Sequence, residues 1–213
     1  SYYLAQCYTN TDQDKFARNT FYKAYQMNFN DTISENALIN YAALSFIPGI
    51  DPFNETVDIL SEYITKNPNS SNIDEFQEIV INLLLNSNKY HEALETIEQY
   101  SNLSQELKNI KTQLTYNVGI QYYNKGQYDN AIDYLRKSIN SKGITSKTQS
   151  EATFWLADAY YRKDDKNNAL KTYQQFINSP MASNTDVYPL AYYNLGYLYL
   201  NNGELNNASI RFK

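Results

Sequence analysis

The stretch "YNVGIQYYNKGQYDNAIDYL" (residues 116–135) decides the fold of this chain. Its composition is helical, yet it contains Gly119 and Gly126, and a glycine inside a helix costs about 1 kcal/mol relative to alanine. Each glycine therefore needs a structural reason. We expect Gly126 to end a helix with a positive φ angle. We expect Gly119 to lie where a partner helix packs too closely for a side chain. The stretch predicts two helices joined by a tight turn.

The same pattern recurs along the chain with a period near 38 residues. A small residue anchors each copy, and successive anchors are separated by 37 to 39 residues, with a one-residue insertion predicted around Pro48 and Gly49. A period that holds over six copies indicates a structural repeat. The anchors are Ala17, Thr56, Ala93, Ala131, Ala169 and Ala208.

Other positions recur at helical spacing from each anchor. Spacings of three and four residues place side chains on one face of a helix, so each copy predicts two amphipathic helices. The small residues twelve positions before the anchor are Ala5, Gly119, Ala157 and Gly196. The aromatic residues nine positions before it are Tyr8, Tyr122, Tyr160 and Tyr199. The bulky apolar residues four positions after it are Phe21, Leu60, Ile97, Leu135, Tyr173 and Phe212.

These columns resemble the tetratricopeptide repeat, in which an aliphatic and a small residue, an aromatic residue, a turn and an alanine follow in this order. The resemblance covers essentially the whole chain, although the family's usual period is about 34 residues. It implies an all-α fold, a right-handed α-solenoid of about six helix-turn-helix repeats that forms a single domain over residues 1–213. The repeats are expected at residues 1–28, 33–68, 72–102, 104–141, 146–179 and 186–213.

Local signals bear on the register and on the ends of the chain. Asp51 before Pro52 predicts a helix N-cap followed by proline at the first helical position. Ser146 with Gln149 predicts a capping box at the start of the helix that contains Phe154. The chain opens on "SYYLAQCY" and closes inside a helical pattern, so we expect a fragment of a longer repeat protein whose array continues or whose ends self-associate.

The composition argues against nucleic-acid binding and against catalysis. The formal net charge is −5 and no basic stripe is present to neutralise phosphates. The longest apolar run, residues 79–85, is too short to span a bilayer. No glycine-rich phosphate loop, HExxH or CxxC motif occurs. We expect Cys7 to be ordinary packing, His91 to be a surface residue, and Asp164 and Asp165 to be capping residues. The sequence thus predicts a protein that is not an enzyme and uses no cofactor or metal.

The first helix of each copy is expected to carry a binding surface. In the tetratricopeptide family, the positions fifteen, eleven, eight and seven before the anchor face the concave groove where peptides bind. Here they hold mainly aromatic rings and asparagine amides, which can contact an extended chain and pair with its backbone. The alternative is that many of the 22 tyrosines fill space between repeats. The candidate groove residues are Tyr2, Asn10, Asn82, Asn86, Tyr116, Tyr123, Asn124, Phe154, Asp158, Tyr161, Arg162, Tyr193, Tyr197 and Asn201.

Two hypotheses for the function follow from this surface. The first is a protein-interaction module that binds a peptide or a partner protein in the groove. The second is a structural spacer in a cell-envelope complex, with no discrete ligand. A long period rich in tyrosine and asparagine resembles large tetratricopeptide proteins of Gram-negative envelopes, of the Tol-Pal-associated and outer-membrane-assembly types. That resemblance implies a periplasmic or outer-membrane-associated location, with the cytoplasm as the alternative.

Overall fold

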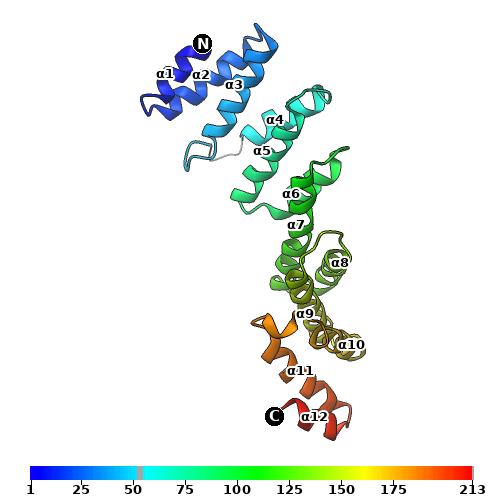
Figure 1. Cartoon of the computed structure of the whole chain (residues 1–213). Helices are drawn as coiled ribbons and strands as arrows, with labels where there is room; N and C mark the ends of the chain where they lie inside the picture. Colours follow the sequence, from blue (N-terminus) through cyan, green and yellow to red (C-terminus); the bar gives the residue numbers. More distant parts are fainter. Residues whose placement is uncertain (52–54, 213) are drawn as a thin grey trace. The chain divides into compact units, whose positions relative to one another are not determined.

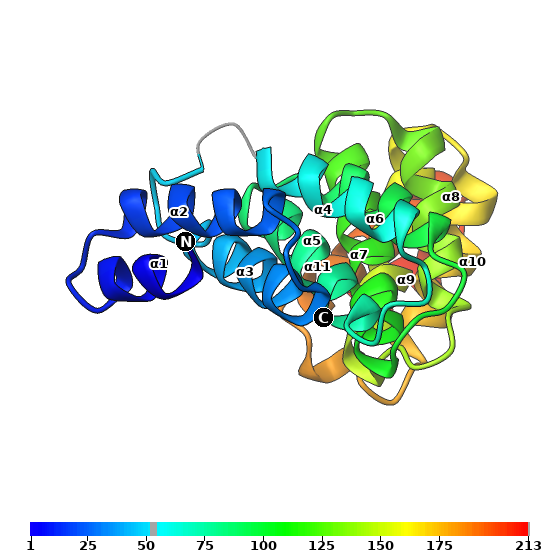
Figure 2. The ribbon, with the colours of Figure 1, turned by 90° about the horizontal axis from the view of Figure 1, so that it is seen from above.

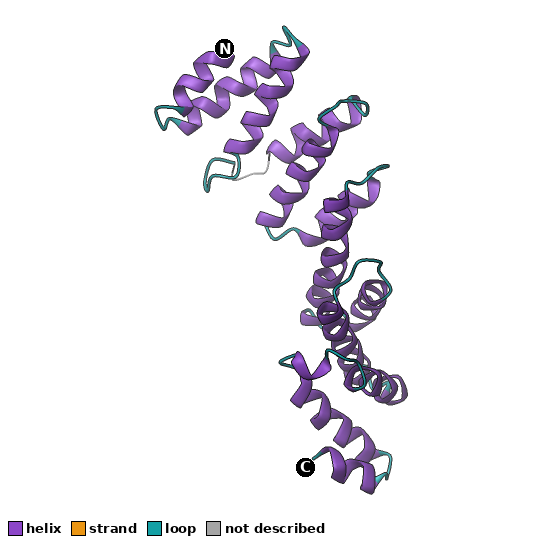
Figure 3. Ribbon diagram, viewed as in Figure 1, coloured by secondary structure: helices purple, strands orange, loops and turns teal. Residues whose placement is uncertain are grey.

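The computed structural model describes residues 1–51 and 55–212 and is built from helices joined by loops (Figure 1). No strand occurs in these two ranges (Figure 3), so the all-α prediction is confirmed. The chain divides into two compact units, Ser1–Ser104 and Gln105–Lys213. The division falls near the start of the predicted fourth repeat, residues 104–141.

The first unit contains three helix pairs that correspond to the first three predicted repeats. Helix α1 packs on α2, α2 on α3, α4 on α5 and α5 on α6, so neighbours in sequence are mostly neighbours in space. The helices are α1 (Tyr2–Thr9), α2 (Asp14–Gln26), α3 (Asp31–Leu44), α4 (Glu55–Lys66), α5 (Ile73–Asn86) and α6 (Tyr90–Gln99).

The second unit continues the pattern with three more pairs. Helices α7 and α9 contact each other directly, and α8 and α10 lie on the same side of them in both views (Figures 1 and 2). The helices are α7 (Gln105–Asn124), α8 (Tyr128–Ile139), α9 (Ser146–Arg162), α10 (Lys166–Ile177), the short 3₁₀ helix η1 (Ala182–Asn184), α11 (Tyr188–Asn201) and α12 (Leu205–Arg211).

The anchor columns form the core of both units, as the repeat pattern predicts. Each anchor is at most 3% exposed, and the residue twelve positions before it is buried in every copy. The second copy has the large residue Leu44 at that position, whereas its fully buried small residue, Ala42, lies fourteen positions before Thr56 and Ala43 is exposed. The prediction of a one-residue insertion near Pro48 and Gly49 was therefore wrong: the insertion is two residues long.

The turn between the paired helices has the same backbone conformation in five of the six copies. Gly126 and Gly203 have φ angles of 72° and 77°, which confirms the predicted glycine turn. The equivalent position, five residues before the anchor, is not glycine in three other copies, yet φ stays positive. Asn and Asp tolerate this region better than most residues. These residues are Asp12 (56°), Asn88 (57°) and Asp164 (61°).

Gly119 lies where the sequence predicts a close helix contact. A Cβ atom added to it would stand 3.0 Å from Cγ and 3.3 Å from the backbone nitrogen of Leu135, on the paired helix α8. Leu135 is fully buried, so it has little room to move. The glycine is thus required by packing and not by the backbone conformation.

The predicted caps are partly corrected by the structure. The Asp51 carboxylate accepts the Glu55 and Thr56 amides, both at 3.0 Å, and so pairs with the first amides of α4, while Pro52, the predicted first helical residue, lies outside the described residues. Thr145, and not Ser146, caps α9, because its hydroxyl accepts the Thr148 amide. The prediction of a capping box at Ser146 was wrong, because Ser146 is already the first residue of α9.

Asp165 follows its prediction, whereas Cys7 does not. Asp165 caps α10 through the Asn168 amide, as expected. Cys7 is exposed, so its prediction as a packed residue was wrong. Its position falls on the outer face of α1, whose buried residue is Ala5.

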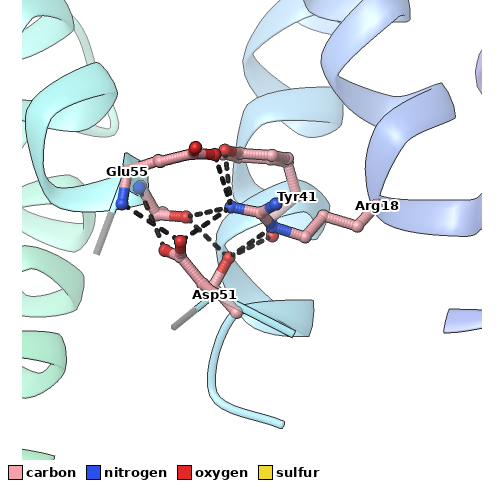
Figure 4. A network of polar contacts seen from close by, with 6 residues as sticks. Arg18, Tyr41, Asp51 and Glu55 are labelled. Atoms are coloured by element: carbon pink, nitrogen blue, oxygen red, sulfur yellow. Dashed lines mark hydrogen bonds and ion pairs between the residues drawn. The ribbon is translucent and has the colours of Figure 1, made fainter. Parts of the chain in front are cut away.

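A buried arginine ties the first two repeats together (Figure 4). Arg18 on α2 is 7% exposed, whereas other copies place the aliphatic residues Val57, Leu94 and Ile132 at this position. Its guanidinium donates to the Tyr41 hydroxyl at 2.8 Å and forms an ion pair with Asp51 at 3.2 Å. Its further partners are Ser45, Thr56 and Glu55. The network links α2 and α3 to the start of α4, across the two-residue insertion.

Candidate peptide-binding site of the second unit

A cavity of about 400 Å³ brings together five of the ten candidate groove residues that lie in the second unit. Its walls come from α7, α9 and α11, which are the first helices of three successive repeats. This is the set of helices that the sequence assigns to the binding face. The candidates that line the cavity are Tyr123, Phe154, Asp158, Tyr161 and Arg162, and the other lining residues are Trp155, Leu190 and Asn194.

Asp158 is the centre of the polar part of this site. The residue is 4% exposed, and both carboxylate oxygens accept hydrogen bonds. Oδ1 accepts from the Tyr173 hydroxyl at 2.7 Å and from the Asn194 amide at 3.2 Å. Oδ2 accepts from the Tyr123 hydroxyl and from Arg162 Nε, the latter at 3.2 Å. Four donors on four helices compensate the desolvation of this carboxylate.

The protonation of the donors holds this network in one arrangement. Burial is the main cause that raises the pKa of the Tyr123 and Tyr173 hydroxyls, and the neighbouring Asp158 carboxylate raises both pKa values further. The hydrogen bond to Asp158 likewise raises the pKa of the Arg162 guanidinium. The tyrosines thus stay protonated donors at neutral pH, so the position of α7 relative to α9 and α11 is fixed by polar contacts as well as by packing.

The other walls of the cavity are aromatic and aliphatic. The Trp155 ring stands edge-to-face against Tyr123, at a centroid distance of 5.0 Å, and against Phe154, at 5.1 Å. Leu190 on α11 is 47% exposed at the rim. Phe154 is fully buried among Tyr173 and Phe176, so it belongs to the core and can contribute only to the floor.

The remaining candidates in the second unit lie outside this cavity. Tyr116 is half-buried, and burial raises its pKa to about 12. Tyr193 and Tyr197 are exposed and pair with each other, at a centroid distance of 4.8 Å, beside Phe212. Asn124 and Asn201 are exposed at the carboxyl ends of α7 and α11.

Four candidates belong to the first unit. Tyr2 is half-buried and packs edge-to-face on Phe21, at a centroid distance of 5.6 Å. Asn82 is half-buried on α5. Asn10 and Asn86 are exposed at the ends of α1 and α5. The role of these four residues in a groove stays a prediction.

Sequence reasoning missed Trp155, Leu190 and Asn194 among the lining residues. Trp155 and Asn194 both lie fourteen positions before their anchors, in a column that also holds Tyr3 and Asn117. Four of the six copies hold an aromatic or amide residue in that column, which was the available signal. Leu190 precedes the regular columns, and only the packing of α11 shows its place.

Other kinds of site find no support in the described residues. Within residues 1–51 and 55–212, no three side chains of the His, Cys, Asp and Glu types gather closely enough to hold a metal ion. None of the described helices combines the length and apolar character needed to cross a lipid bilayer.

Comparisons with known proteins agree with the repeat pattern. Residues 114–143, 151–179 and 190–210 match family models described as tetratricopeptide repeat. These three segments of the second unit are thus similar to the tetratricopeptide repeat. Each matched segment covers parts of one helix pair, namely α7 with α8, α9 with α10, and α11 with α12. The candidate cavity is therefore lined by the first helices of three segments that match this family.

Several solved structures are similar to this chain at low sequence identity. The apo form of RapI superposes with a TM-score of 0.55 at 14% identity, over 99% of this chain and 62% of RapI. The C-terminal part of a TPR repeat-containing protein from Cytophaga hutchinsonii gives a TM-score of 0.49 at 14% identity, over 100% and 76% of the two chains. BtubC from P. vanneervenii gives 0.46 at 13% identity, over 94% and 87%. No curated protein matches the chain in sequence.

Proposed function

We propose that this protein binds an extended segment of a partner protein. One aliphatic or aromatic side chain of that segment enters the cavity of about 400 Å³ around Asp158, which we call the Asp158 cavity. The observation that carries the proposal is the joint lining of one cavity by the first helices of three tetratricopeptide repeats. Tetratricopeptide repeats are typical protein-interaction modules, and their first helices line a continuous surface.

The chemistry of the walls favours a neutral, partly apolar anchor. The pocket volume of about 400 Å³ falls in the range of ligand pockets, which is about 300–1,000 Å³. Trp155 and Leu190 offer apolar contact, and aromatic anchors carry much of the energy in protein interfaces. Asp158 and Arg162 form an ion pair, so the site has no net charge from these two groups.

The site is also organised before a ligand arrives. The Asp158 network holds Tyr123 and Asn194 from two other helices, so their side chains need little reordering on binding. A preorganised site loses less conformational entropy when it binds. The Arg162 side chain is 56% exposed, which leaves much of its guanidinium at the rim to pair with a backbone carbonyl or a carboxylate of the segment.

A fluorescence assay tests the proposal directly. Trp155 is the only tryptophan in the chain, and it lines the cavity. Peptides selected from a random display library on the full chain should change the emission of Trp155 in a saturable manner. Leu190→Ala should weaken such binding about tenfold, as expected for the loss of an apolar contact of about 1.4 kcal/mol.

Leu205→Ala is the matched control. Leu205 is 66% exposed, but it lies on α12, a second helix, and does not line the cavity. Both variants remove the same exposed side chain, so both should leave the thermal midpoint nearly unchanged. Peptides that bind without a change at Trp155, or that are insensitive to Leu190→Ala, would reject this site. Failure to select any peptide that binds the chain would favour the spacer hypothesis.

We also propose an envelope location, on the strength of the long-period, tyrosine-rich and asparagine-rich repeats. Fractionation of cells that express the complete natural gene product would test it. Recovery with the periplasm or the outer membrane supports the proposal, and recovery with the cytoplasm rejects it.

A further inference from the structure

The first unit contains a second pocket, of about 830 Å³, that shares no residue with the cavity described above. It lies at the ends of helices and not along them. The carboxyl ends of α2 and α4, the first turns of α3 and the loop after α4 form its walls. The binding face predicted from the family, which uses the first helices along their length, does not include it.

A fixed carboxylate forms one wall of this pocket. Glu35 on α3 accepts hydrogen bonds from the Tyr63 hydroxyl on α4 and from the Ser70 hydroxyl at 2.7 Å. Its second oxygen accepts from the Asn72 amide at 2.9 Å. These contacts hold α3, α4 and the following loop in place, so the pocket has a defined shape.

One lining side chain lacks a partner. Ser34 is 5% exposed, and its Oγ forms no hydrogen bond with any of the described residues. Ser34 lines the pocket beside Glu35. A buried hydroxyl without a partner costs free energy, and native proteins seldom leave one unsatisfied. The Ser34 hydroxyl is enclosed as it stands, so it can pair with a group that enters the pocket only after a rotation about χ1.

The lining is polar, with aromatic surface at one side. Asn28, Asn67 and Asn69 supply amides that can donate and accept, and the half-buried Tyr25 supplies a ring. The charged lining residues are Asp31, Glu35 and Lys66, which sum to one negative charge. An anion would meet repulsion there, and an aliphatic side chain would leave these polar groups unpaired.

We propose that this pocket binds a neutral, hydroxyl-rich ring, which is the chemistry of a monosaccharide or of one unit of a glycan. Ring hydroxyls pair with the asparagine amides and with Ser34, and the Tyr25 ring covers an apolar face of the sugar. The volume of the pocket is within the range that holds small ligands.

The experiment titrates the isotope-labelled full chain with neutral sugars and follows its amide resonances. The probes are glucose, N-acetylglucosamine and maltose, and glucose 6-phosphate is the anionic counterpart. We expect saturable shifts for at least one neutral sugar at the amides of Asn28, Ser34 and Asn69. We expect weaker binding of the phosphate. Ser34→Ala should weaken sugar binding about three- to tenfold, as the loss of one hydrogen bond predicts, without lowering the thermal midpoint.

Ser138→Ala is the matched control, because Ser138 is also fully buried with an unpartnered hydroxyl but does not line this pocket. It should leave sugar binding unchanged. The proposal is overturned if no neutral sugar gives saturable shifts, if the phosphate binds more tightly, or if the two serine variants weaken binding equally. Trp155 emission reports the second-unit site separately, so either proposal can fail alone.

Discussion

The contact at Gly119 allows a quantitative test of the repeat packing. In Gly119→Ala, the new Cβ would stand 3.0 Å from Leu135 Cγ, 3.1 Å from Cδ2 and 3.3 Å from the backbone nitrogen. The backbone of α8 must give way by a few tenths of an ångström. Overpacking of this kind costs about 1–3 kcal/mol, and replacing glycine in a helix recovers about 1 kcal/mol. The net cost for alanine is thus about 0–2 kcal/mol.

Gly119→Val should be clearly worse, because valine adds two methyl groups at the same contact and is a poorer helix former than alanine. We expect a loss of about 3 kcal/mol. For a unit of roughly 100 residues, each 1 kcal/mol lowers the thermal midpoint by about 4–8 °C. The thermal midpoint of the second unit, measured by circular dichroism, should therefore fall by more than about 10 °C.

Gly196→Ala is the informative comparison. Its Cβ would come still closer to a neighbour, at 2.7 Å from Cε1 of Phe212. That atom belongs to the far end of a ring that is 47% exposed and can swing away. Gly196→Ala should thus lower the free energy of unfolding less than Gly119→Ala, although its new contact is closer. An unchanged midpoint for Gly119→Val, or a greater loss for Gly196→Ala than for Gly119→Ala, would refute this packing argument.

Three other predictions concern the turn, the buried arginine and alkaline pH. Gly126→Ala should lower the free energy of unfolding by about 1 kcal/mol through backbone strain alone, because φ is 72° and no atom lies near the added Cβ. A thermal melt measures this loss, and an unchanged midpoint would contradict the turn geometry. Arg18→Leu should destabilise the first unit by about 3 kcal/mol or more in urea, because it leaves Asp51 and the Tyr41 hydroxyl without this partner; a midpoint equal to wild type would reject that role. Burial raises the pKa of Tyr116 from 10.0 to about 12, so the unfolded chain loses this proton first. The contribution of Tyr116 to the free energy of unfolding should be complete below pH 10 and should fall as the pH rises through 12. Tyr116→Phe should therefore lose less stability at alkaline pH than the wild type. Identical dependence of stability on pH in the two proteins would contradict the raised pKa.

The positions of the repeats could be read from sequence because each column obeys a local rule. Ala17, Ala131 and Ala169 are small because a partner helix packs on them, and they recur at a fixed distance from a turn. The turn itself was recognised only where it was glycine. Asp12, Asn88 and Asp164 hold the same conformation, but these residues also cap helices and coat surfaces, so their identity alone does not predict a positive φ.

The candidate site was predictable only in part. The family columns pointed to Tyr123, Asp158 and Arg162, and the structure places all three at one cavity. Phe154 occupies a groove column but is fully buried, because its ring fits between Tyr173 and Phe176. Sequence spacing gives the angular position of a side chain on its helix. It does not show how far the next helix covers that side chain.

The sequence by itself determined that the chain is helical, where the helix pairs lie and which small residues they share, because helix periodicity and turn stereochemistry act over a few neighbouring residues. Only the tertiary structure decided which polar groups meet. Asp158 joins Tyr123 and Asn194, which are 35 and 36 residues away, and Glu35 joins Asn72, which is 37 residues away. These contacts depend on linker lengths and on how closely successive helices pack, and a shift of one helix by a single residue would separate them.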